Sequence, residues 1–515
     1  MSFKANTLFY TDGYKVGHKA MLAPGTTKLY GTWIPRSTKH APGGINKILS
    51  FGQQMVWKWI NDEFEENFFY TDRRFTGTVF NSFEHNAELK SKALTFVKDM
   101  SLYLGMEYDG DHFAALWDLG YLPIKVKALP EGIETGPNIP HMTFVNTVDG
   151  FAWLPLYLET IVSSLAWKPS TSASIALQYR RNLVKWVTKT DPANLWLIDY
   201  MCHDFSARGL DPWSMLSSGL GHATSHKGSD SLIVIPGARY FYNEPENEVS
   251  INSVNASEHS VSTTKIFTVG EKQMIADWLQ IFPKGILSIV ADTFDLWTLI
   301  TEYLPANKDA IMAREGKLVI RPDSGDPVDI ICGYNTDNGF YSEIETAEPS
   351  YKGVIELLWD IFGGTINEQG YKVLDPHIGA IYGDSINLDR QVQIYERLAA
   401  KGFAATNIVL GVGSYTYQMN TRDTFGFAAK GAWFEADGVG YDIYKDPITD
   451  DGTKKSLKGK VAVIEEEDEY KVLTQCTSEQ EETGLLQTIF EDGKFYNQTT
   501  LTEIRKRIAE LSIKS

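Results

Sequence analysis

Four short apolar runs, each ending in polar or glycine residues, constrain the fold of this chain more than any other feature. They lie at 289–292, 317–326, 378–385 and 408–414. Continuous β-rich runs bounded by Gly, Asp or Ser are typical of strands that are buried on both faces of a parallel sheet. Stretches with helical spacing separate the runs, so the sequence predicts an α/β fold in which parallel strands alternate with helices.

The residues that follow these runs predict a ligand site. In parallel α/β folds, ligands bind where the carboxyl ends of the strands and their loops converge. Arg321, Asp323 and Asp384 would therefore meet in one pocket with the glycine-rich turns. A cationic arginine and bare backbone N–H groups suit phosphate, whereas carboxylates suit ribose hydroxyls, a metal ion or a developing cation. The combination indicates an enzyme that acts on a sugar phosphate.

Composition limits the size and charge class of the protein. Its 515 residues exceed one ordinary core, so two or more domains are expected. The net charge of −18 argues against a general nucleic-acid or anionic-membrane role. Cys202, Cys332 and Cys476 are far apart and show neither a disulfide framework nor metal-ligand spacing, as expected in a reducing cytosol. The sequence has no signal h-region and no bilayer-length apolar run, which predicts a cytoplasmic location and no membrane partner.

Three segments are expected along the chain. Residues 1–170 are predicted to be an N-terminal α+β segment, residues 171–434 an α/β barrel that carries the active site, and residues 435–515 hairpins and a helix that pack with the N-terminal segment. The patterns that support this division predict strands at 28–34 and 122–129, helices at 53–64, 156–167, 172–187, 271–282, 387–401 and 502–511, and hairpins at 461–473 and 488–496.

A polar cluster at 252–260 contains the first candidate for chemistry, His259. A histidine flanked by Glu258 and hydroxyl residues suits a nucleophile or an acid–base group, with a carboxylate such as Asp292 orienting the ring. The alternative is a helix N-terminus in which Ser257 and Glu258 act as caps and His259 is incidental. Spacing alone favours the capping alternative.

Three further motifs fit a nucleotide-like ligand. Phe205 and Arg208 follow a strand-like run and could stack a flat ring and hold a phosphate, but this motif alone favours the simpler interpretation of a buried Phe with a surface Arg. Asp230 in the Gly-Ser-Asp turn is most simply a turn residue. Asp384 and Gly413 end strands, where polar residues are common in active sites.

Together these segments resemble the nicotinamide phosphoribosyltransferases of the type II phosphoribosyltransferase family. The resemblance covers nearly the whole chain, in order, and rests on nine segments: 11–18, 122–132, 203–209, 227–230, 253–260, 321–325, 383–384, 421–423 and 444–447. It implies an irregular (β/α) barrel plus an α+β domain formed by the N- and C-terminal segments.

The resemblance implies a reaction as well as a fold. Nicotinamide and phosphoribosyl pyrophosphate would give nicotinamide mononucleotide and pyrophosphate in NAD salvage, with Mg²⁺ accompanying the pyrophosphate substrate. ATP would be a coupled substrate that phosphorylates His259, oriented by Asp292. The enzyme would be a homodimer with shared active sites, and its partners would be these small molecules rather than nucleic acid. The alternatives are a nicotinate phosphoribosyltransferase and a catalytically silent nucleotide-binding homologue.

The resemblance also implies roles for the base-binding residues. Phe205 and a Tyr14 from the second subunit would sandwich the nicotinamide ring, and Asp230 would accept a hydrogen bond from the carboxamide. A carboxylate at position 230 would repel the carboxylate of nicotinate, which separates the two substrates. Asp12 and Ser253 lie in the matching segments and are also expected to bind substrate.

The remaining implied roles concern the phosphates and the ribose. Arg208 and Arg321 would hold phosphates, and Asp323 the ribose hydroxyls. The 5′-phosphate would be cradled by Gly383, Asp384, Gly413 and Ser414, and Arg422 and Lys430 of the second subunit would reach the same phosphate. The expected catalytic set is His259, Asp292 and Asp323. Ser414 stands where a further glycine is usual in the family, and a left-handed backbone there would be strained.

Overall fold

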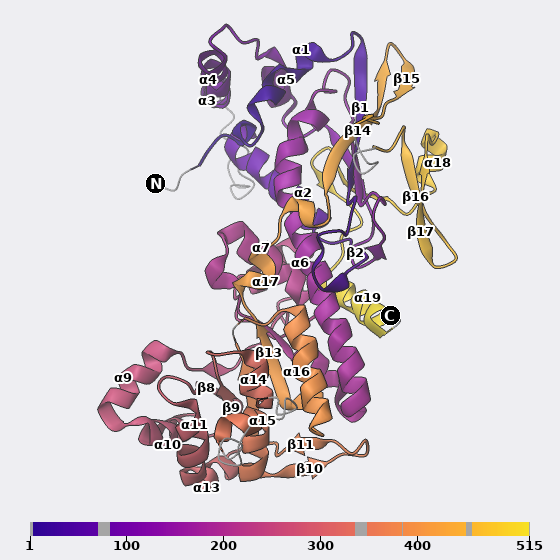
Figure 1. Ribbon diagram of the computed structural model, residues 1–515. Helices are drawn as coiled ribbons and strands as arrows, with labels where there is room; N and C mark the ends of the chain where they lie inside the picture. Colours follow the sequence, from indigo (N-terminus) through magenta and orange to yellow (C-terminus); the bar gives the residue numbers. More distant parts are fainter. Residues whose placement is uncertain (1–3, 71–82, 335–347, 384, 450–455, 514–515) are drawn as a thin grey trace. The chain divides into compact units, whose positions relative to one another are not determined.

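The computed structural model describes residues 4–70, 83–334, 348–383, 385–449 and 456–513 (Figure 1). The chain divides into two compact units. Unit one comprises residues 1–174, 240–243 and 421–504, and unit two comprises residues 175–239, 244–420 and 505–515.

Unit two is built on a parallel sheet. Its strand order is β6-β13-β12-β9-β8-β7, and every neighbouring pair is parallel. The strands are β6 (Cys202–Asp204), β13 (Ile408–Val412), β12 (Ile378–Tyr382), β9 (Leu318–Arg321), β8 (Leu287–Val290) and β7 (Asn255–Ala256). All residues of β8 and β12 are buried, as their continuous apolar sequences predict. The predicted parallel strands are therefore confirmed.

Two isolated bridges carry this sheet toward closure. Asp204 at the end of β6 pairs in parallel with Ser229, and Gly228 pairs in parallel with Asn252, which precedes β7. Pairing thus returns from one edge strand to the other through two very short segments. Such irregular closure confirms the expected barrel and turns the carboxyl ends of its strands toward a common mouth.

Helices connect the strands in the alternating manner expected of an α/β chain. The longer ones are α7 (Pro212–Ala223), α9 (His259–Val269), α10 (Glu271–Ile281), α15 (Pro349–Phe362) and α16 (Leu388–Ala400). The Asn387 side chain caps α16 by accepting from the N–H of Arg390 at 2.8 Å, and Gly402 follows the helix with φ 77°. These are the start and stop signals that the sequence predicted.

Unit one is built on an antiparallel sheet of seven strands that come from both the N-terminal and the C-terminal parts of the chain. The order is β15-β14-β1-β5-β3-β18-β19. The strands are β15 (Val439–Asp442), β14 (Ala428–Ala436), β1 (Thr26–Ile34), β5 (Met142–Asn146), β3 (Ile124–Ala128), β18 (Gln487–Glu491) and β19 (Lys494–Phe495). N-terminal and C-terminal strands therefore share one sheet. The barrel boundary expected at residue 434 falls inside β14, whose neighbours are β1 and β15.

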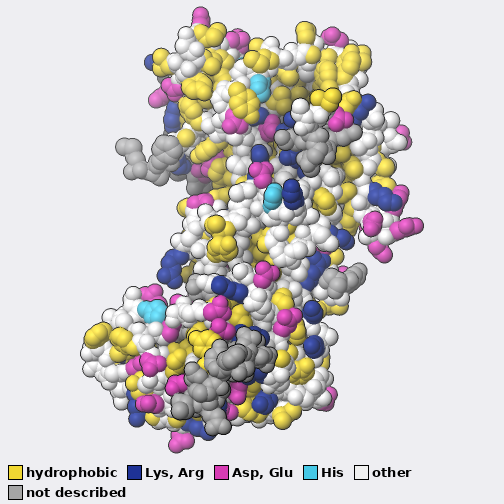
Figure 2. All heavy atoms as spheres, viewed as in Figure 1, with side chains coloured by type: hydrophobic (Ala, Val, Ile, Leu, Met, Phe, Trp, Pro, Cys, Tyr) yellow, Lys and Arg dark blue, Asp and Glu magenta, His cyan; other side chains and the backbone are white. Residues whose placement is uncertain are grey.

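The other predicted elements of unit one are present. Helix α2 spans Gln53–Phe64, and the hairpin predicted at 461–473 consists of β16 (Val461–Glu466) and β17 (Glu469–Thr474). The closing helix is α19 (Leu501–Ile513), and its last part belongs to unit two. On the face shown in Figure 2, acidic and basic side chains are interspersed, so the net negative charge is not gathered in one patch there.

One secondary-structure prediction was wrong. The two helices expected at 156–167 and 172–187 are a single helix, α6 (Leu154–Thr190), which contains Pro169. A proline removes one helical hydrogen bond, and this normally ends or kinks a helix. Packing offsets the cost here: Gly52 leaves room for the proline ring, since a Cβ at Gly52 would lie 2.4 Å from its Cγ, and the Ser170 hydroxyl donates to the carbonyl of Leu49.

Candidate active site

The carboxyl ends of the barrel strands surround an open cavity of about 800 Å³ in unit two. Its lining contains eight of the residues proposed from sequence: Phe205, Arg208, Asp230, Arg321, Asp323, Gly383, Gly413 and Ser414. They come from the ends of different strands, and the parallel sheet places them at one edge. Asp384, which was also proposed, lies outside the described residues.

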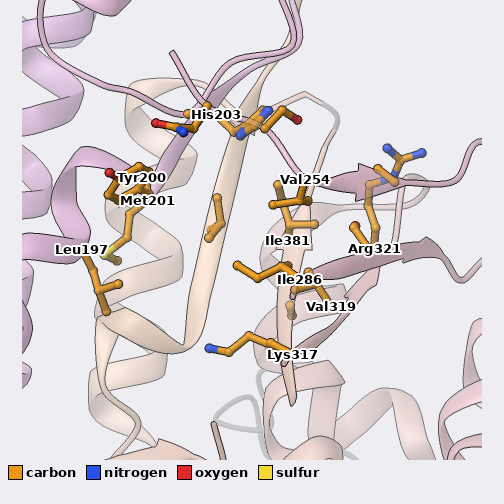
Figure 3. A pocket seen from close by; sticks show the side chains of 18 of the residues that line it. Leu197, Tyr200, Met201, His203, Val254, Ile286, Lys317, Val319, Arg321 and Ile381 are labelled. Carbon is orange, nitrogen blue, oxygen red and sulfur yellow. The ribbon is translucent and has the colours of Figure 1, made fainter. Parts of the chain in front are cut away.

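A second, mainly apolar cavity of about 380 Å³ extends from this site into the barrel. It shares Phe205, Asp230 and Arg321 with the open cavity. Figure 3 shows His203 at one end and Lys317 at the other, with Ile286, Val319 and Ile381 among the side chains between them. Burial lowers the pKa of Lys317, against the opposing charge of Asp375. A flat apolar ring fits between such walls with its polar substituent at the rim.

Asp230 stands where the two cavities meet, and its carboxylate is held on one side. The Nε2–H of His203 donates to Oδ1 at 3.0 Å, and the Ser253 hydroxyl makes a short hydrogen bond to the same oxygen. Burial acts to raise the pKa of Asp230, but these hydrogen bonds and the charges of His203 and Arg321 outweigh it and lower the pKa. The carboxylate therefore stays ionised, and Oδ2 makes no hydrogen bond that the described residues record.

Phe205 forms the aromatic wall of the site. Its ring lies 4.6 Å from the His203 ring, centroid to centroid. It packs against the backbone of Gly411, where a Cβ would approach a ring carbon to 2.5 Å, and near Gly383, where a Cβ would lie 3.6 Å away. Glycine at position 411 is thus required for the ring to lie against strand β13. The platform is fixed before any ligand arrives.

His259 stands beside two of the proposed carboxylates. Its Nε2 lies 3.6 Å from Oδ1 of Asp292 and 3.9 Å from Oδ2 of Asp323, and its Nδ1 lies 3.3 Å from the Thr293 hydroxyl. Its side chain is 46% exposed, whereas that of Asp292 is 6% exposed. A half-exposed imidazole backed by a buried carboxylate is suited to accept a group from a ligand in the open cavity.

Asp292 is itself fixed by its neighbours. Its Oδ2 accepts from the N–H of Asp323 at 2.9 Å and from the Ser324 hydroxyl at 2.5 Å. These contacts tie the end of β8 to the loop after β9 and leave Oδ1 facing His259. The carboxylate can therefore orient the imidazole and stabilise its charged form.

The capping alternative for His259 is correct in the position of the helix N-terminus but not in its hydrogen bonds. Helix α9 begins at His259 with Glu258 at the N-cap position, but Glu258 makes no side-chain capping hydrogen bond. The Ser257 hydroxyl instead accepts from the N–H of Val290 at 2.9 Å and so joins β7 to β8. His259 is the first residue of the helix, and its side chain is half-exposed.

The two arginines of the open cavity are placed differently. Arg321 ends β9, and its Nε is buried without a hydrogen-bond partner among the described residues. Arg208 belongs to a short turn of helix, Ala207–Gly209, and is exposed. A buried unsatisfied guanidinium N–H costs stability unless a ligand pairs it, so Arg321 is suited to an anion that binds there.

The turn after β13 is not strained. Gly413 has φ −82°, and Ser414 begins the short helix α17 (Ser414–Gln418) without a positive φ. The conformational problem expected at Ser414 is therefore absent. A Cβ at Gly209 would lie against the Ser414 side chain, so these two positions are complementary.

The other proposed residues lie in unit one. Tyr14, on the 3₁₀ turn Gly13–Gly17, is 67% exposed. Asp12 accepts from the Thr160 hydroxyl at 2.7 Å, and Lys430 lies 3.5 Å from Glu159. Asp12 and Lys430 thus contact neighbouring positions of α6, and the Tyr14 hydroxyl lies 3.5 Å from Oδ2 of Asp12. Arg422 is separate, with its guanidinium 3.6 Å from Asp423.

Three contacting residues were not proposed from sequence: His203, Thr293 and Ser324. His203 was the most accessible of them, because it lies in the segment 203–209 and immediately precedes a strand end. Thr293 and Ser324 adjoin proposed carboxylates, but only the loop geometry turns their hydroxyls toward the site.

No helix within the described ranges is both long and apolar enough to cross a membrane.

Comparison with known proteins identifies the family. The model of the nicotinate phosphoribosyltransferase (NAPRTase) family matches residues 200–494. The chain is 40% identical to the nicotinamide phosphoribosyltransferase of Acinetobacter baylyi, over 99% of this chain and 98% of that protein. It is 32% identical to that of Mycoplasma pneumoniae, over 88% and 94% respectively. The chain therefore belongs to the nicotinate phosphoribosyltransferase family and is a phosphoribosyltransferase.

Solved structures support the fold. Nicotinate-nucleotide pyrophosphorylase from Pyrococcus furiosus superimposes with a TM-score of 0.55 at 14% identity, covering 100% of this chain and 98% of that chain. Human nicotinic acid phosphoribosyltransferase gives a TM-score of 0.52 at 13% identity, covering 98% and 93%. At these identities the likeness concerns architecture alone.

Proposed function

We propose that this enzyme transfers a phosphoribosyl group to nicotinamide and releases pyrophosphate, as a step of NAD salvage. One observation carries the choice of base: an ionised Asp230, held on one oxygen by His203 and Ser253, stands at the rim of a ring-sized apolar cavity. The oxygen that remains accepts a hydrogen bond from a carboxamide NH₂. A nicotinate carboxylate would meet repulsion at the same position.

The geometry supplies positioning and charge rather than a strong nucleophile for the transfer itself. Loss of pyrophosphate leaves an oxocarbenium-like ribosyl centre, so the rate depends on holding the ring nitrogen against that carbon. Phe205 stacks the ring, Asp323 holds the ribose hydroxyls, and Arg321 pairs with phosphate oxygens. Gly383, Gly413 and Ser414 present backbone N–H groups toward the 5′-phosphate.

Mg²⁺ is proposed to arrive with the phosphoribosyl substrate. Within the described ranges, no group of three or more His, Cys, Asp or Glu side chains is arranged to hold a metal ion. Mg²⁺ commonly binds through substrate phosphates and one or two carboxylates, which fits a site with Asp323 beside the phosphate pocket. When bound, the ion would neutralise charge on the leaving pyrophosphate.

ATP coupling and assembly complete the proposal. ATP would phosphorylate His259, and the added negative charge would organise the neighbouring cationic groups around the substrate. The enzyme would act as a homodimer in which Asp12, Tyr14, Arg422 and Lys430 of one subunit complete the partner's site. What supports this is the resemblance together with the exposure of Tyr14 and the contacts of Asp12 and Lys430 with neighbouring positions of α6.

The test is mononucleotide formation with nicotinamide and with nicotinate side by side, with and without ATP. Nicotinamide should be used at least tenfold more efficiently, because removing one charge repulsion and gaining one hydrogen bond each change affinity several-fold. Asp230→Asn should reduce nicotinamide efficiency and admit nicotinate. Equal use of both bases by the parent enzyme would transfer the assignment to a nicotinate phosphoribosyltransferase, and no product from either would indicate a silent homologue.

A further inference from the structure

A fully buried histidine of unit two, His222, connects two parts of the site. It lies on α7 and touches neither cavity. Its Nε2 is 3.0 Å from the carbonyl oxygen of Gly228, and its Nδ1 is 2.7 Å from the hydroxyl of Tyr417. Gly228 begins the turn that carries Asp230, and Tyr417 lies on α17, which begins at Ser414.

The chemistry of the two contacts fixes their direction. A carbonyl oxygen only accepts, so Nε2 carries the proton and donates to Gly228. Nδ1 is then an acceptor, and the Tyr417 hydroxyl donates to it. Burial lowers the pKa of His222, despite the nearby charge of Asp204, in agreement with a neutral ring. Both nitrogens are satisfied, and the ring forms a rigid link of defined polarity.

We infer that His222 is a positioning residue that sets the separation between the base-recognition turn and the phosphate turn. Asp230 would hold the carboxamide at one end of the mononucleotide, and the Gly413–Ser414 turn would hold the 5′-phosphate at the other. Tyr417 transmits the link, because it lies on the same short helix as Ser414. The inference rests on the proposed function for its kinetic consequences but not for the link itself.

A second contact strengthens the phosphate side. The Thr416 hydroxyl donates to the carbonyl of Ile386 at 3.1 Å, which attaches α17 to the loop that follows Gly383. The Gly228 carbonyl also accepts from the N–H of Asp204 at 3.0 Å, which attaches the base turn to β6. The base turn is thus anchored to β6, and α17 is anchored to the loop after β12. Strands β6 and β13 are paired directly, and the His222–Tyr417 contact is a further, side-chain link between the two turns.

The alternative interpretation is that His222 is only a well-paired core residue, and a second buried histidine provides a control for the loss of a buried ring. His226 is equally buried in the same unit, and its Nε2 bonds to the carbonyl of Ala176 at 3.1 Å, on α6 rather than on either turn. Its Nδ1 has no hydrogen-bond partner among the described residues, and its ring lies 5.0 Å from the His222 ring, so His226→Ala reports the loss of a buried ring from the same cluster without loss of the link. If the burial and packing of the ring alone matter, His226→Ala and His222→Ala should have equal kinetic effects.

Three variants separate the two halves of the link. Tyr417→Phe removes only the hydroxyl, and should raise the KM for phosphoribosyl pyrophosphate about fivefold, the value of one lost hydrogen bond, with the nicotinamide KM within twofold. His222→Gln can still donate to Gly228 and should behave similarly. His222→Ala loses both contacts and should raise both KM values about fivefold or more, with smaller changes in kcat. Equal effects of His226→Ala, or identical shifts of both KM values in all three variants, would overturn the inference.

Amide hydrogen exchange tests the link without turnover. His222→Ala should speed exchange of the Asp230 amide and of the Thr416 amide together, each by about fivefold, because both turns lose their shared anchor. Tyr417→Phe should act on Thr416 more than on Asp230, and His226→Ala on neither. If the parent forms no nicotinamide mononucleotide, the proposed function fails while the exchange result still decides the link. Unchanged exchange at both amides in His222→Ala would refute it.

Discussion

The two units carry their candidate functional residues in different ways. In unit two, the residues end parallel strands, and fixed neighbours hold them: Asp230 by His203 and Ser253, Asp292 by the loop after β9, and Phe205 by Gly411. In unit one, Tyr14 and Arg422 are mostly exposed, and their recorded contacts are few. The candidate residues of unit two are therefore positioned by the fold itself. The exposed residues of unit one would be positioned only when a ligand or partner binds them.

The largest expected effect is in the preorganised unit. Arg321→Lys keeps the charge but removes the planar fork, and should lower kcat/KM by about a hundredfold, as expected for one lost transition-state donor. Arg397→Lys is a matched control, because Arg397 pairs with Asp329 at 2.7 Å outside both cavities. It should stay within about twofold. Similar losses in both variants would mean that Arg321 acts through folding.

The second prediction tests whether unit one contributes at all. Tyr14→Ala and Phe205→Ala should each reduce activity by about fivefold to 150-fold, because each removes about 1–3 kcal/mol of ring stacking. If the site is shared, mixing the two impaired chains restores about a quarter of the parental activity, since half of the dimers are mixed and one site in each carries neither mutation. Native mass spectrometry should verify subunit exchange, and absence of recovery after exchange would contradict the shared site.

The sequence predicted unit two better than unit one for a physical reason. Buried parallel strands such as 287–290 and 378–382 are continuous apolar runs, and their polar ends necessarily share one edge. It missed the role of His203, which depends on the bridge that brings Gly228 and Asp230 beside β6. In unit one, local patterns predicted the hairpins and α2, but pairing of β14 with β1 joins residues some 400 positions apart, which no local pattern encodes.

The third prediction concerns ATP coupling at His259. His259→Ala should abolish ATP hydrolysis and leave a slow, ATP-independent transfer, because Phe205, Arg321 and Asp323 remain in place. Asp292→Asn should fall between the two, since it keeps the imidazole but weakens its orientation and its cationic form. Mass spectrometry under conditions that preserve acid-labile phosphate should detect phosphohistidine in the parent only. ATP stimulation that persists in His259→Ala would remove this role.

The fourth prediction concerns the pH dependence of the free energy of unfolding, which depends on two buried histidines of unit one. Burial lowers the pKa of His112 to about 4, assisted by the charge of Lys19, and lowers the pKa of His141 to about 3. Below about pH 6.5 these histidines are protonated in the unfolded chain but remain neutral in the folded chain. The free energy of unfolding therefore decreases as the pH falls from 6.5 toward 4. His112→Phe, which keeps a ring beside Trp153, should reduce the slope of unfolding free energy with pH by about 1.4 kcal/mol per unit in that window. Denaturant titrations from pH 7 to 4.5 measure it, and an unchanged slope would mean that His112 titrates normally.

The smallest effect is expected at Ser414, a position of unit two whose backbone conformation is easily misjudged from sequence. A glycine is usual there in the family, which suggests that serine is strained, but Ser414 has a helical backbone at the start of α17. Ser414→Gly therefore relieves no strain, and the backbone N–H that would face the phosphate is unchanged. The KM for phosphoribosyl pyrophosphate should stay within about twofold, while added backbone freedom lowers the unfolding free energy by up to about 1 kcal/mol. Gly209→Ala is the informative counterpart, because its new methyl group would collide with the Ser414 side chain and displace the same turn. A large gain in phosphate affinity in Ser414→Gly, without any effect of Gly209→Ala, would show that the serine restricts the turn in a way that the folded geometry does not explain.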